Sequence, residues 1–348
     1  MPKFAAYSTF VLASFALWSA RIDRTISMPH HGGAGVPRYY LGVDGGGTNC
    51  RIRLADENLV TLAEVRNGRS NLQIDGGDPA YKAISDGMRD AFASAEIDIA
   101  QAANTYACFG MAGGRMDSAR AAFSARPWPF AGVKVYDDID IAHAGALGGE
   151  DGGVAIVGTG SAALSIIDGQ RFQVGGWGFQ IGDQMSGAII GRELARMSVE
   201  ATDGLIGASP LTEEIIRLLG GNNQAAMTWS FATEMDLKII SRDGTEGCDD
   251  VLIGRAPGEF GRLVPVLMEY FDKGDPIAKQ LIDIQMGYID TYVRWFKSTG
   301  AKKLAIVGGF GQRLFPLLEQ RYGDFVALPR FEPLHGALIL AKQNFASA

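Results

Sequence analysis

The stretch LGVDGGGTNCRIRLAD, residues 41–56, places three glycines between two apolar runs. The residues on either side have the composition of strands, so we expect strands at 39–43 and 50–55 joined by a tight turn. This turn has two explanations. It is a hairpin turn that needs glycine only for positive φ, or it is a loop whose bare N–H groups approach a phosphate, with the Thr48 hydroxyl as a further donor.

Asp44 stands directly before the three glycines. If the turn holds phosphate, the Asp44 carboxylate lies close to that phosphate, and two negative groups repel each other unless a cation lies between them. We therefore expect Asp44 to face Mg²⁺, directly or through a water. The stretch is neither a GxxxxGK[ST] P-loop nor a GxGxxG turn that opens a helix, because a strand follows the glycines.

Two further glycine turns favour the phosphate interpretation. VGTGSAA, at 157–163, again lies between apolar strands, expected at 154–157 and 162–167, and is a weak internal repeat of the first unit. In IVGGFGQRL, at 306–314, glycines follow a strand and open a helix, which suits backbone packed against a base or ribose. Together the turns predict nucleotide binding. The candidate ATP and phosphate residues are Gly45, Gly46, Gly47, Thr48, Thr159, Gly160, Ser161, Gly308 and Gly309.

Strands and helices alternate along most of the chain, which predicts an α/β protein with covered sheets. The glycine-rich stretch LGGEDGG, at 147–153, is the expected boundary between two domains. The other expected strands are 59–66, 105–109, 133–136 and 304–307. The expected helices are 79–95, 118–124, 138–147, 185–199, 312–320 and 333–342, with a mostly helical segment at 211–299.

Composition limits the classes of protein that fit. A length of 348 residues suggests about two domains, and 47% apolar residues are usual for a globular protein. A net charge of −7 argues against a broad nucleic-acid surface. The three cysteines, Cys50, Cys108 and Cys248, are too far apart for a CxxC metal site and predict no disulfide framework. We expect them to be buried, reduced thiols.

Residues 1–38 differ from the rest of the chain. They begin with an apolar run at 4–20, which is short for a membrane span, and continue with charged and Gly/Pro-rich residues. Three explanations remain: a start codon assigned too early, with Met28 as the initiator; a disordered or membrane-touching leader; or an export signal. We favour the first. Export is least favoured, because Trp18 stands where a signal peptidase needs a small residue.

Eight motifs occur in one order between Tyr39 and Lys342: GVDGGGTN, RSNLQ, MAGG, YDDIDIAHAGAL, VGTGS, GGWGFQIGDQMSG, KGDP and VGGFG. In this order they resemble the N-acetylglucosamine kinase and glucosamine kinase family. These are BadF/BadG/BcrA/BcrD-type ATPases of the sugar-kinase, Hsp70 and actin superfamily, and they include the activator ATPases of benzoyl-CoA-type reductases.

The resemblance implies two ribonuclease-H-like lobes, the actin-like ATPase fold, with nucleotide and sugar in a cleft between them. After the leader at 1–38, we expect an N-terminal lobe at 39–148 and a C-terminal lobe at 149–348. The second lobe would carry a helical insertion at about 205–300, and the last helix would pack back on the first lobe.

Asp138 is the candidate catalytic base. It follows the strand expected at 133–136 and begins a helix, so a simple N-cap is the alternative. The resemblance favours the base, because the family's catalytic aspartate lies in this strand-end motif and Asp138 matches it better than Asp137. Asp140 is expected on a solvated face of the helix.

The resemblance also implies a sugar site. Its residues would be Asn71 in RSNLQ, Gly113 in MAGG, Asp138, Gly176 in GGWG and Asp183 in IGDQ. Without the resemblance, Asn71 would be a turn residue and Asp183 an N-cap for the helix expected from Met185. Trp177 is expected to pack rather than to bind the sugar.

Two departures from the family pattern leave the substrate open. Gln184 replaces the glutamate of the usual GDEGS, and Ala162 follows GTGS where N-acetylglucosamine kinases carry asparagine. A site built around a polar group discriminates strongly, so these changes bear on the choice among N-acetylglucosamine, glucosamine and another amino sugar.

The resemblance thus implies a cytoplasmic, ATP- and Mg²⁺-dependent amino-sugar kinase acting on N-acetylglucosamine or glucosamine, at the 6-hydroxyl. Its partner would be the small sugar, with no nucleic acid, no stable membrane association and a homodimer as a family expectation. The alternative is an activator ATPase coupled to a redox partner, but no cysteine stands in that group's helix-start CxxGR setting. A sugar-sensing repressor would need an N-terminal DNA-binding module, for which residues 1–38 are too short and apolar.

Overall fold

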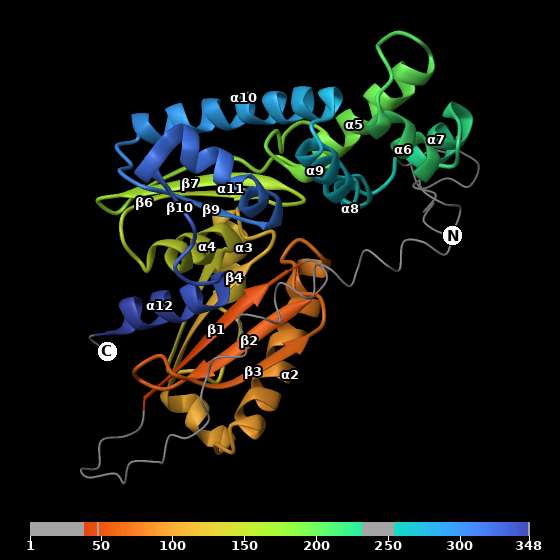
Figure 1. The fold of residues 1–348 in the computed structure, drawn as a ribbon. Helices are drawn as coiled ribbons and strands as arrows, with labels where there is room; N and C mark the ends of the chain where they lie inside the picture. Colours follow the sequence, from red (N-terminus) through yellow and green to blue (C-terminus); the bar gives the residue numbers. More distant parts are fainter. Residues whose placement is uncertain (1–37, 47–48, 232–253, 347–348) are drawn as a thin grey trace, which may run out of the picture. The chain divides into compact units, whose positions relative to one another are not determined.

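The computed structural model describes residues 38–46, 49–231 and 254–346, and in these residues the chain forms two five-stranded sheets (Figure 1). The leader expected at 1–38 therefore lies outside the described residues except for Arg38, as do Gly47, Thr48 and Cys248.

The first sheet has the order β3-β2-β1-β4-β5. β1 pairs antiparallel with β2, and β2 with β3, whereas β1, β4 and β5 are parallel. Helix α2 packs against β2 and β3, as Figure 1 shows, and buries a core led by Ile52, Phe92 and Phe109. The strands are β1 (Tyr39–Gly45), β2 (Cys50–Ala55), β3 (Thr61–Asn67), β4 (Thr105–Met111) and β5 (Gly132–Asp137), and the helices are α2 (Asp78–Ser94) and α3 (Asp117–Ser124).

The second sheet repeats this plan. Its order is β10-β9-β6-β7-β8, with β6, β7 and β8 antiparallel in turn and β6, β9 and β10 parallel. The weak repeat of strand, glycine turn and strand is thus a repeat of whole sheets, and each glycine turn joins the first two strands of its sheet. The strands are β6 (Gly152–Val157), β7 (Ser161–Ile167), β8 (Gln170–Gly175), β9 (Leu304–Val307) and β10 (Val326–Ala327).

Helices cover the second sheet and bury the larger of the apolar cores, which contains Leu194, Phe296 and Leu314. In Figure 1, α10 is the long helix drawn beside α11. These helices are α5 (Gly187–Thr202), α6 (Pro210–Leu218), α7 (Asn223–Ser230), α8 (Pro257–Gly261), α9 (Val264–Asp272), α10 (Pro276–Ser298) and α11 (Gly309–Tyr322). The described residues also form three short 3₁₀ helices: η1 (Asp75–Gly77), η2 (Ile99–Asn104) and η3 (Gly323–Phe325).

Two helices connect the sheets. α4 (Asp138–Leu147) follows β5 and contacts strands of both sheets, and almost all its residues are buried. α12 (Pro333–Phe345), the last helix, contacts α4, β1 and β4. The two helices meet where both backbones are bare: a Cβ on Gly336 would lie 2.0 Å from the Ile141 carbonyl oxygen, and one on Gly145 would lie 2.4 Å from that of Glu332.

Some expected boundaries differ from those observed. β8 and β10 were absent from the expected strands, and α11 begins at Gly309 rather than at Gln312. The helix expected from Met185 begins at Gly187 and is capped by Ser186, whose Oγ accepts a hydrogen bond from the Ile189 N–H. The alternative explanation of Asp183, as the N-cap of this helix, is therefore excluded.

Candidate functional site

The first glycine turn is tied by its backbone to the two loops expected to hold sugar. The Ser70 N–H donates to the Gly46 carbonyl oxygen over 3.0 Å, and the Ala112 N–H donates to that of Gly45 over 2.7 Å. These bonds bring RSNLQ, with Asn71, and MAGG, with Gly113, beside the turn. A Cβ on Gly45 would lie 2.7 Å from the Met111 sulfur, so a larger residue at this position would displace the Met111 side chain.

Asn71 and Gly113 are in direct contact. The Asn71 Oδ1 accepts a hydrogen bond of 2.8 Å from the Gln73 N–H, which closes a local turn. The Gln73 side chain in turn donates to the Gly113 carbonyl oxygen over 2.8 Å. Gly113 has φ +76°, and a Cβ there would lie 2.4 Å from Asn71 Oδ1. The turn reading of Asn71 is correct, and its amide also lies in the candidate sugar site.

Asp44 forms an ion pair that the sequence pattern did not reveal. Arg51 lies directly opposite Asp44 on β2 and donates to Asp44 Oδ2 from Nη2 over 2.8 Å and from Nε over 3.3 Å. Arg51 also donates to Glu332, at the N-terminus of α12. Both bonds from Arg51 to Asp44 end on Oδ2, so Asp44 Oδ1 accepts neither of them.

A magnesium ion fits this arrangement only as a partner of bound nucleotide. The described residues contain no group of three or more His, Cys, Asp or Glu side chains that could hold a metal by themselves. Mg²⁺ usually keeps several waters and takes one or two protein carboxylates together with substrate phosphates. Asp44 Oδ1, beside the glycine turn, matches that requirement.

Asp138 is the first residue of α4, and its side chain is open to solvent although protein surrounds it on most sides. Partial desolvation by the surrounding protein raises its pKa to about 7, and the negative charges of Asp137 and Asp44 act in the same direction, whereas a hydrogen bond from the Ile139 backbone opposes them. Asp137, rather than Asp138, is the N-cap of α4. Asp138 is therefore left without that structural duty and remains accessible to a ligand.

Asp137 and Asp140 flank Asp138 and are buried, at 5% and 6% exposure. The expectation that Asp140 lies on a solvated face is wrong, because Arg171 of β8 covers it: Nε donates to Oδ1 over 2.7 Å, and Nη2 donates to Oδ2 over 3.3 Å. The next residue on the same face of β8, Gln173, donates to Asp137 Oδ2 over 3.3 Å. Burial raises the pKa of Asp137, and the Gln173 bond opposes this.

The second glycine turn lies against the loop that contains Asp183. The Asp183 carboxylate accepts hydrogen bonds from the backbone N–H groups of Ser161 and Gly178. Burial raises the pKa of Asp183, and these two bonds lower it. The Gly187 N–H, at the start of α5, donates to the Gly158 carbonyl oxygen over 2.7 Å. The second turn and the expected sugar-side carboxylate thus lie in one place.

Arg115 connects the loops of the two sheets. It directly follows MAGG, and its Nη1 donates over 2.7 Å to the carbonyl oxygen of Gly175, at the end of β8. Its guanidinium carbon lies 3.6 Å from the centre of the Trp177 ring. Gly176 adjoins this contact, because a Cβ there would lie 3.4 Å from Arg115 Nη1. Trp177 therefore stacks on arginine and is 59% exposed, rather than packed in a core.

In the third glycine patch, the two candidate residues Gly308 and Gly309 differ in how closely other atoms surround them. A Cβ on Gly308, which has φ +101°, would lie 2.6 Å from the Val157 carbonyl oxygen. Gly309 has no neighbouring atom within 4 Å of such a Cβ, so its surface is free to pack against a ligand. Gly47 and Thr48 lie outside the described residues.

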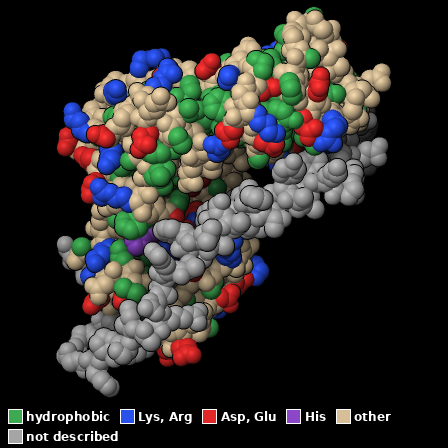
Figure 2. Space-filling model, in the orientation of Figure 1, with side chains coloured by type: hydrophobic (Ala, Val, Ile, Leu, Met, Phe, Trp, Pro, Cys, Tyr) green, Lys and Arg blue, Asp and Glu red, His purple; other side chains and the backbone are tan. Residues whose placement is uncertain are grey.

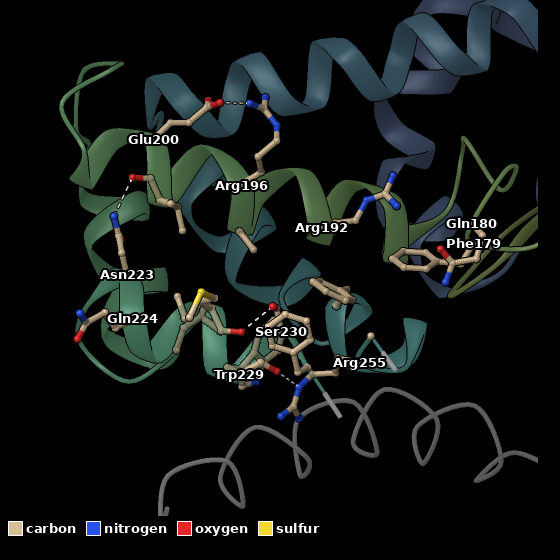
Figure 3. Close-up of a pocket in the computed structure, with 18 residues that line it drawn as sticks. Phe179, Gln180, Arg192, Arg196, Glu200, Asn223, Gln224, Trp229, Ser230 and Arg255 are labelled. Carbon is tan, nitrogen blue, oxygen red and sulfur yellow. Dashed lines mark hydrogen bonds and ion pairs between the residues drawn. The ribbon is translucent and has the colours of Figure 1, made fainter. Parts of the chain in front are cut away.

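A separate cavity of about 760 Å³ lies beside α5 and α7 (Figure 3). Its wall contains Arg192, which lies over the Phe179 ring, and Trp229, which packs edge-on against Phe260. None of the site residues expected from the sequence lines it. Its rim includes Phe231 and Gly254, between which the described chain is interrupted.

Other expectations concern the surface and the thiols. On the face shown in Figure 2, acidic and basic side chains are interspersed. No helix in the described part of the chain has the length and apolar character of a membrane span. Cys50 and Cys108 are free and buried, and burial raises the pKa of Cys50 to about 12. The expectation of buried thiols is correct for these two.

Comparisons with known proteins find similar sequences and structures. A family model described as the BadF/BadG/BcrA/BcrD ATPase family matches residues 41–270. Glucosamine kinase GspK of Vibrio cholerae is 25% identical over 303 residues, covering 87% of this chain and 95% of that protein. N-acetyl-D-glucosamine kinase of Dictyostelium discoideum is 28% identical over 279 residues, covering 76% and 81%. A solved structure from Chromobacterium violaceum, described as a candidate N-acetylglucosamine kinase, is 29% identical with a TM-score of 0.71, covering 87% and 99%.

Proposed function

The chain belongs to the BadF/BadG/BcrA/BcrD ATPase family and has the two-lobed α/β fold of the actin-like ATPases, and from this we propose that it is an ATP-dependent amino-sugar kinase. Its acceptor would be N-acetylglucosamine or glucosamine, the sugars after which the related kinases of Dictyostelium discoideum and Vibrio cholerae are named, and the acceptor atom would be the 6-hydroxyl oxygen. The proposed lobes are 39–148 and 149–348.

The observation that supports this proposal best is the state of Asp138. A base for phosphoryl transfer must reach the acceptor hydroxyl and must have a pKa near the working pH. Asp138 is accessible, has a pKa of about 7, and lies on the helix that follows the strand end next to Gly113's loop. Asp138 would accept the hydroxyl proton while the sugar oxygen attacks the γ-phosphorus and ADP leaves.

The remaining candidate residues would bind and orient the reactants. The glycine turns at Gly45–Gly46 and at Thr159–Ser161 would lie with their bare backbone against the phosphates, and Gly308 and Gly309 would pack against the nucleoside. Asp44 would hold Mg²⁺, which when bound neutralises phosphate charge. The sugar ligands would be Asn71, Gly113, Asp138, Gly176 and Asp183.

A coupled ADP-release assay tests the proposal on the purified chain, with glucosamine, N-acetylglucosamine, glucose and no sugar. We expect turnover that depends on an amino sugar, and a loss of about 10²- to 10⁴-fold in kcat for Asp138→Asn. Asp168→Asn is the matched control, because Asp168 is an exposed turn residue with φ +50°, a backbone that asparagine also adopts. An Asp138→Asn enzyme as active as the control would refute the base assignment.

The same assay addresses the 6-hydroxyl. We expect 6-deoxy-N-acetylglucosamine to accept no phosphate when the 6-hydroxyl is the acceptor. Phosphorus NMR of the product would identify the phosphorylated oxygen directly, and a phosphate on another carbon would correct the assignment.

The activator-ATPase alternative needs cysteines that can hold an iron–sulfur cluster between subunits. Cys50 and Cys108 lie on inner strands with fully buried side chains, so neither can reach a cluster at a surface. Cys248 lies outside the described residues. Iron analysis of anaerobically purified protein distinguishes the two functions: a kinase contains no stoichiometric iron, and an activator does.

A further inference from the structure

The N-terminus of α4 concentrates negative charge around the proposed base. Asp138 has Asp137 before it and Asp140 two residues after it, and Asp44 approaches from β1. Two arginines reach these carboxylates: Arg51 of β2 pairs with Asp44, and Arg171 of β8 pairs with Asp140. His143, one turn further along α4, is buried against the Gly152 carbonyl oxygen, and burial lowers its pKa.

β8 contributes only the partly buried Val174 to the apolar core, and its polar residues Arg171 and Gln173 bind the carboxylates of Asp140 and Asp137 instead. Arg171 and Gln173 alternate with Phe172, so they share one face of the strand. Arg171 holds Asp140 with two bonds, and its Nη2 lies 3.9 Å from Asp137 Oδ2. Gln173 binds that same oxygen of Asp137. One strand of the second sheet, β8, thus binds both Asp137 and Asp140, the carboxylates on either side of Asp138 at the start of α4.

We propose that Arg171 is a positioning residue for phosphoryl transfer: from β8 it neutralises and orients Asp140 and Asp137, which flank Asp138. The inference rests on the proposed function of the same site. Without Arg171, the flanking carboxylates would face Asp138 uncompensated, and an ionised Asp138 would become costlier because like charges disfavour it. Arg171 itself does not touch the reacting atoms.

The test is a double-mutant cycle read as pH profiles of kcat/KM. The acid limb is the pH range over which kcat/KM falls as the base becomes protonated, and Arg171→Met should move it to higher pH by about one unit. One unit is the low end of the effect of a nearby like charge on a pKa. Activity should recover above that pH range. Asp140→Asn should move the limb to lower pH. The double variant, Arg171→Met with Asp140→Asn, removes both charges and should return the limb close to that of the wild type.

Two further variants separate charge from geometry. Arg171→Lys keeps the charge with a single donor group and should keep the limb in place. Arg321→Met removes an arginine that pairs with Asp290 at the far end of α11, and should leave the profile unchanged. Equal activity losses at every pH in Arg171→Met, with no recovery in the double variant, would show a purely structural role and overturn the proposal.

A second readout does not depend on the kinase activity. Carbon-13 NMR of aspartate-labelled protein follows the Asp138 carboxyl, assigned by its absence in Asp138→Asn. We expect the midpoint pH of the Asp138 titration to rise in Arg171→Met and to return to the wild-type value in the double variant. If the wild type shows no sugar-dependent turnover, the proposed function fails. The NMR midpoints still decide the arginine's role, because an unmoved midpoint in Arg171→Met would refute it.

Discussion

At the scale of the residue, Asp138 combines two properties that rarely coincide: access to a ligand and a pKa well above that of an ordinary aspartate. The chain achieves this by giving the helix cap to Asp137. As the cap, the Asp138 side chain would accept backbone hydrogen bonds beyond the one from Ile139, and these would favour the carboxylate and lower its pKa further. The division of duties between two adjacent aspartates therefore suits Asp138 to its proposed role as the base.

The pKa of Asp138 predicts how activity depends on pH. A base must be deprotonated, and its pKa of about 7 means that the active form declines as the pH falls through 7. We expect log kcat/KM to fall with a slope of about one below that pH. A profile flat down to pH 5, in an enzyme whose chemistry limits the rate, would contradict this.

Substitution of Gly113 should lower the stability of the fold for two reasons, a steric contact and an unfavourable backbone conformation. Gly113→Ala would place a Cβ 2.4 Å from Asn71 Oδ1, in addition to the cost of φ +76°, about 1–2 kcal/mol. Gly169→Ala is the matched control, with φ +74° and no neighbouring atom. We expect Gly113→Ala to lower the melting temperature further than the control and to raise KM for the sugar. Equal effects would show that only φ matters.

At the scale of the element, the sequence predicted the strands around the glycine turns because those strands follow a simple apolar pattern. It missed β8, whose sequence QRFQVG is polar because Arg171 and Gln173 serve the carboxylates of α4. For the same reason it placed Asp140 at the surface. Pairing between residues so far apart leaves no local periodicity. The motifs located the loops of the site, whereas their arginine partners required the structure.

The crossing of α4 and α12 predicts opposite results for two helical glycines. Gly336→Ala would force a Cβ to within 2.0 Å of the Ile141 carbonyl oxygen, so the helices must separate. Gly287→Ala, in the exposed middle of α10, meets no atom and should stabilise the helix by about 0.5–1 kcal/mol. Chemical denaturation measures both. We expect a loss of at least about 2 kcal/mol for Gly336→Ala, the scale of a strained core substitution. A neutral Gly336→Ala would mean that the two helices do not meet closely.

At the scale of the whole molecule, the two sheets carry the same strand order and are joined by named contacts at the candidate site: Arg171 with Asp140, Gln173 with Asp137, and Arg115 with Gly175. Each joins a polar side chain to a group on the other half of the chain. Residues near the proposed base are thus among those through which the halves interact, together with the contacts of α12 on β1 and β4.

Arg115 predicts a coupling between these halves that fluorescence can report. Arg115→Ala removes the hydrogen bond to Gly175 and the stacking on Trp177, so the GGWG loop is no longer held to MAGG. We expect KM for the sugar to rise about tenfold, with a smaller change in kcat, since a charged hydrogen bond is worth about 1.5–3 kcal/mol. Trp177 emission should respond to sugar in the wild type, and Trp177→Phe should abolish that response. Unchanged KM and emission in Arg115→Ala would exclude the coupling.

The position of α12 has a consequence for biosynthesis. β1 is among the first described segments to leave the ribosome, and α12, which covers it, is the last. At ordinary rates of translation the interval is some tens of seconds. During that time Leu41 and Val43 can pack against the core on the α2 side of the sheet. The opposite face, with Tyr40 and Gly42, stays uncovered until Ala337 and Leu338 of α12 pack against it. The nascent chain thus presents an apolar face that chaperones can bind, and folding of the first sheet is completed only once α12 has been synthesised.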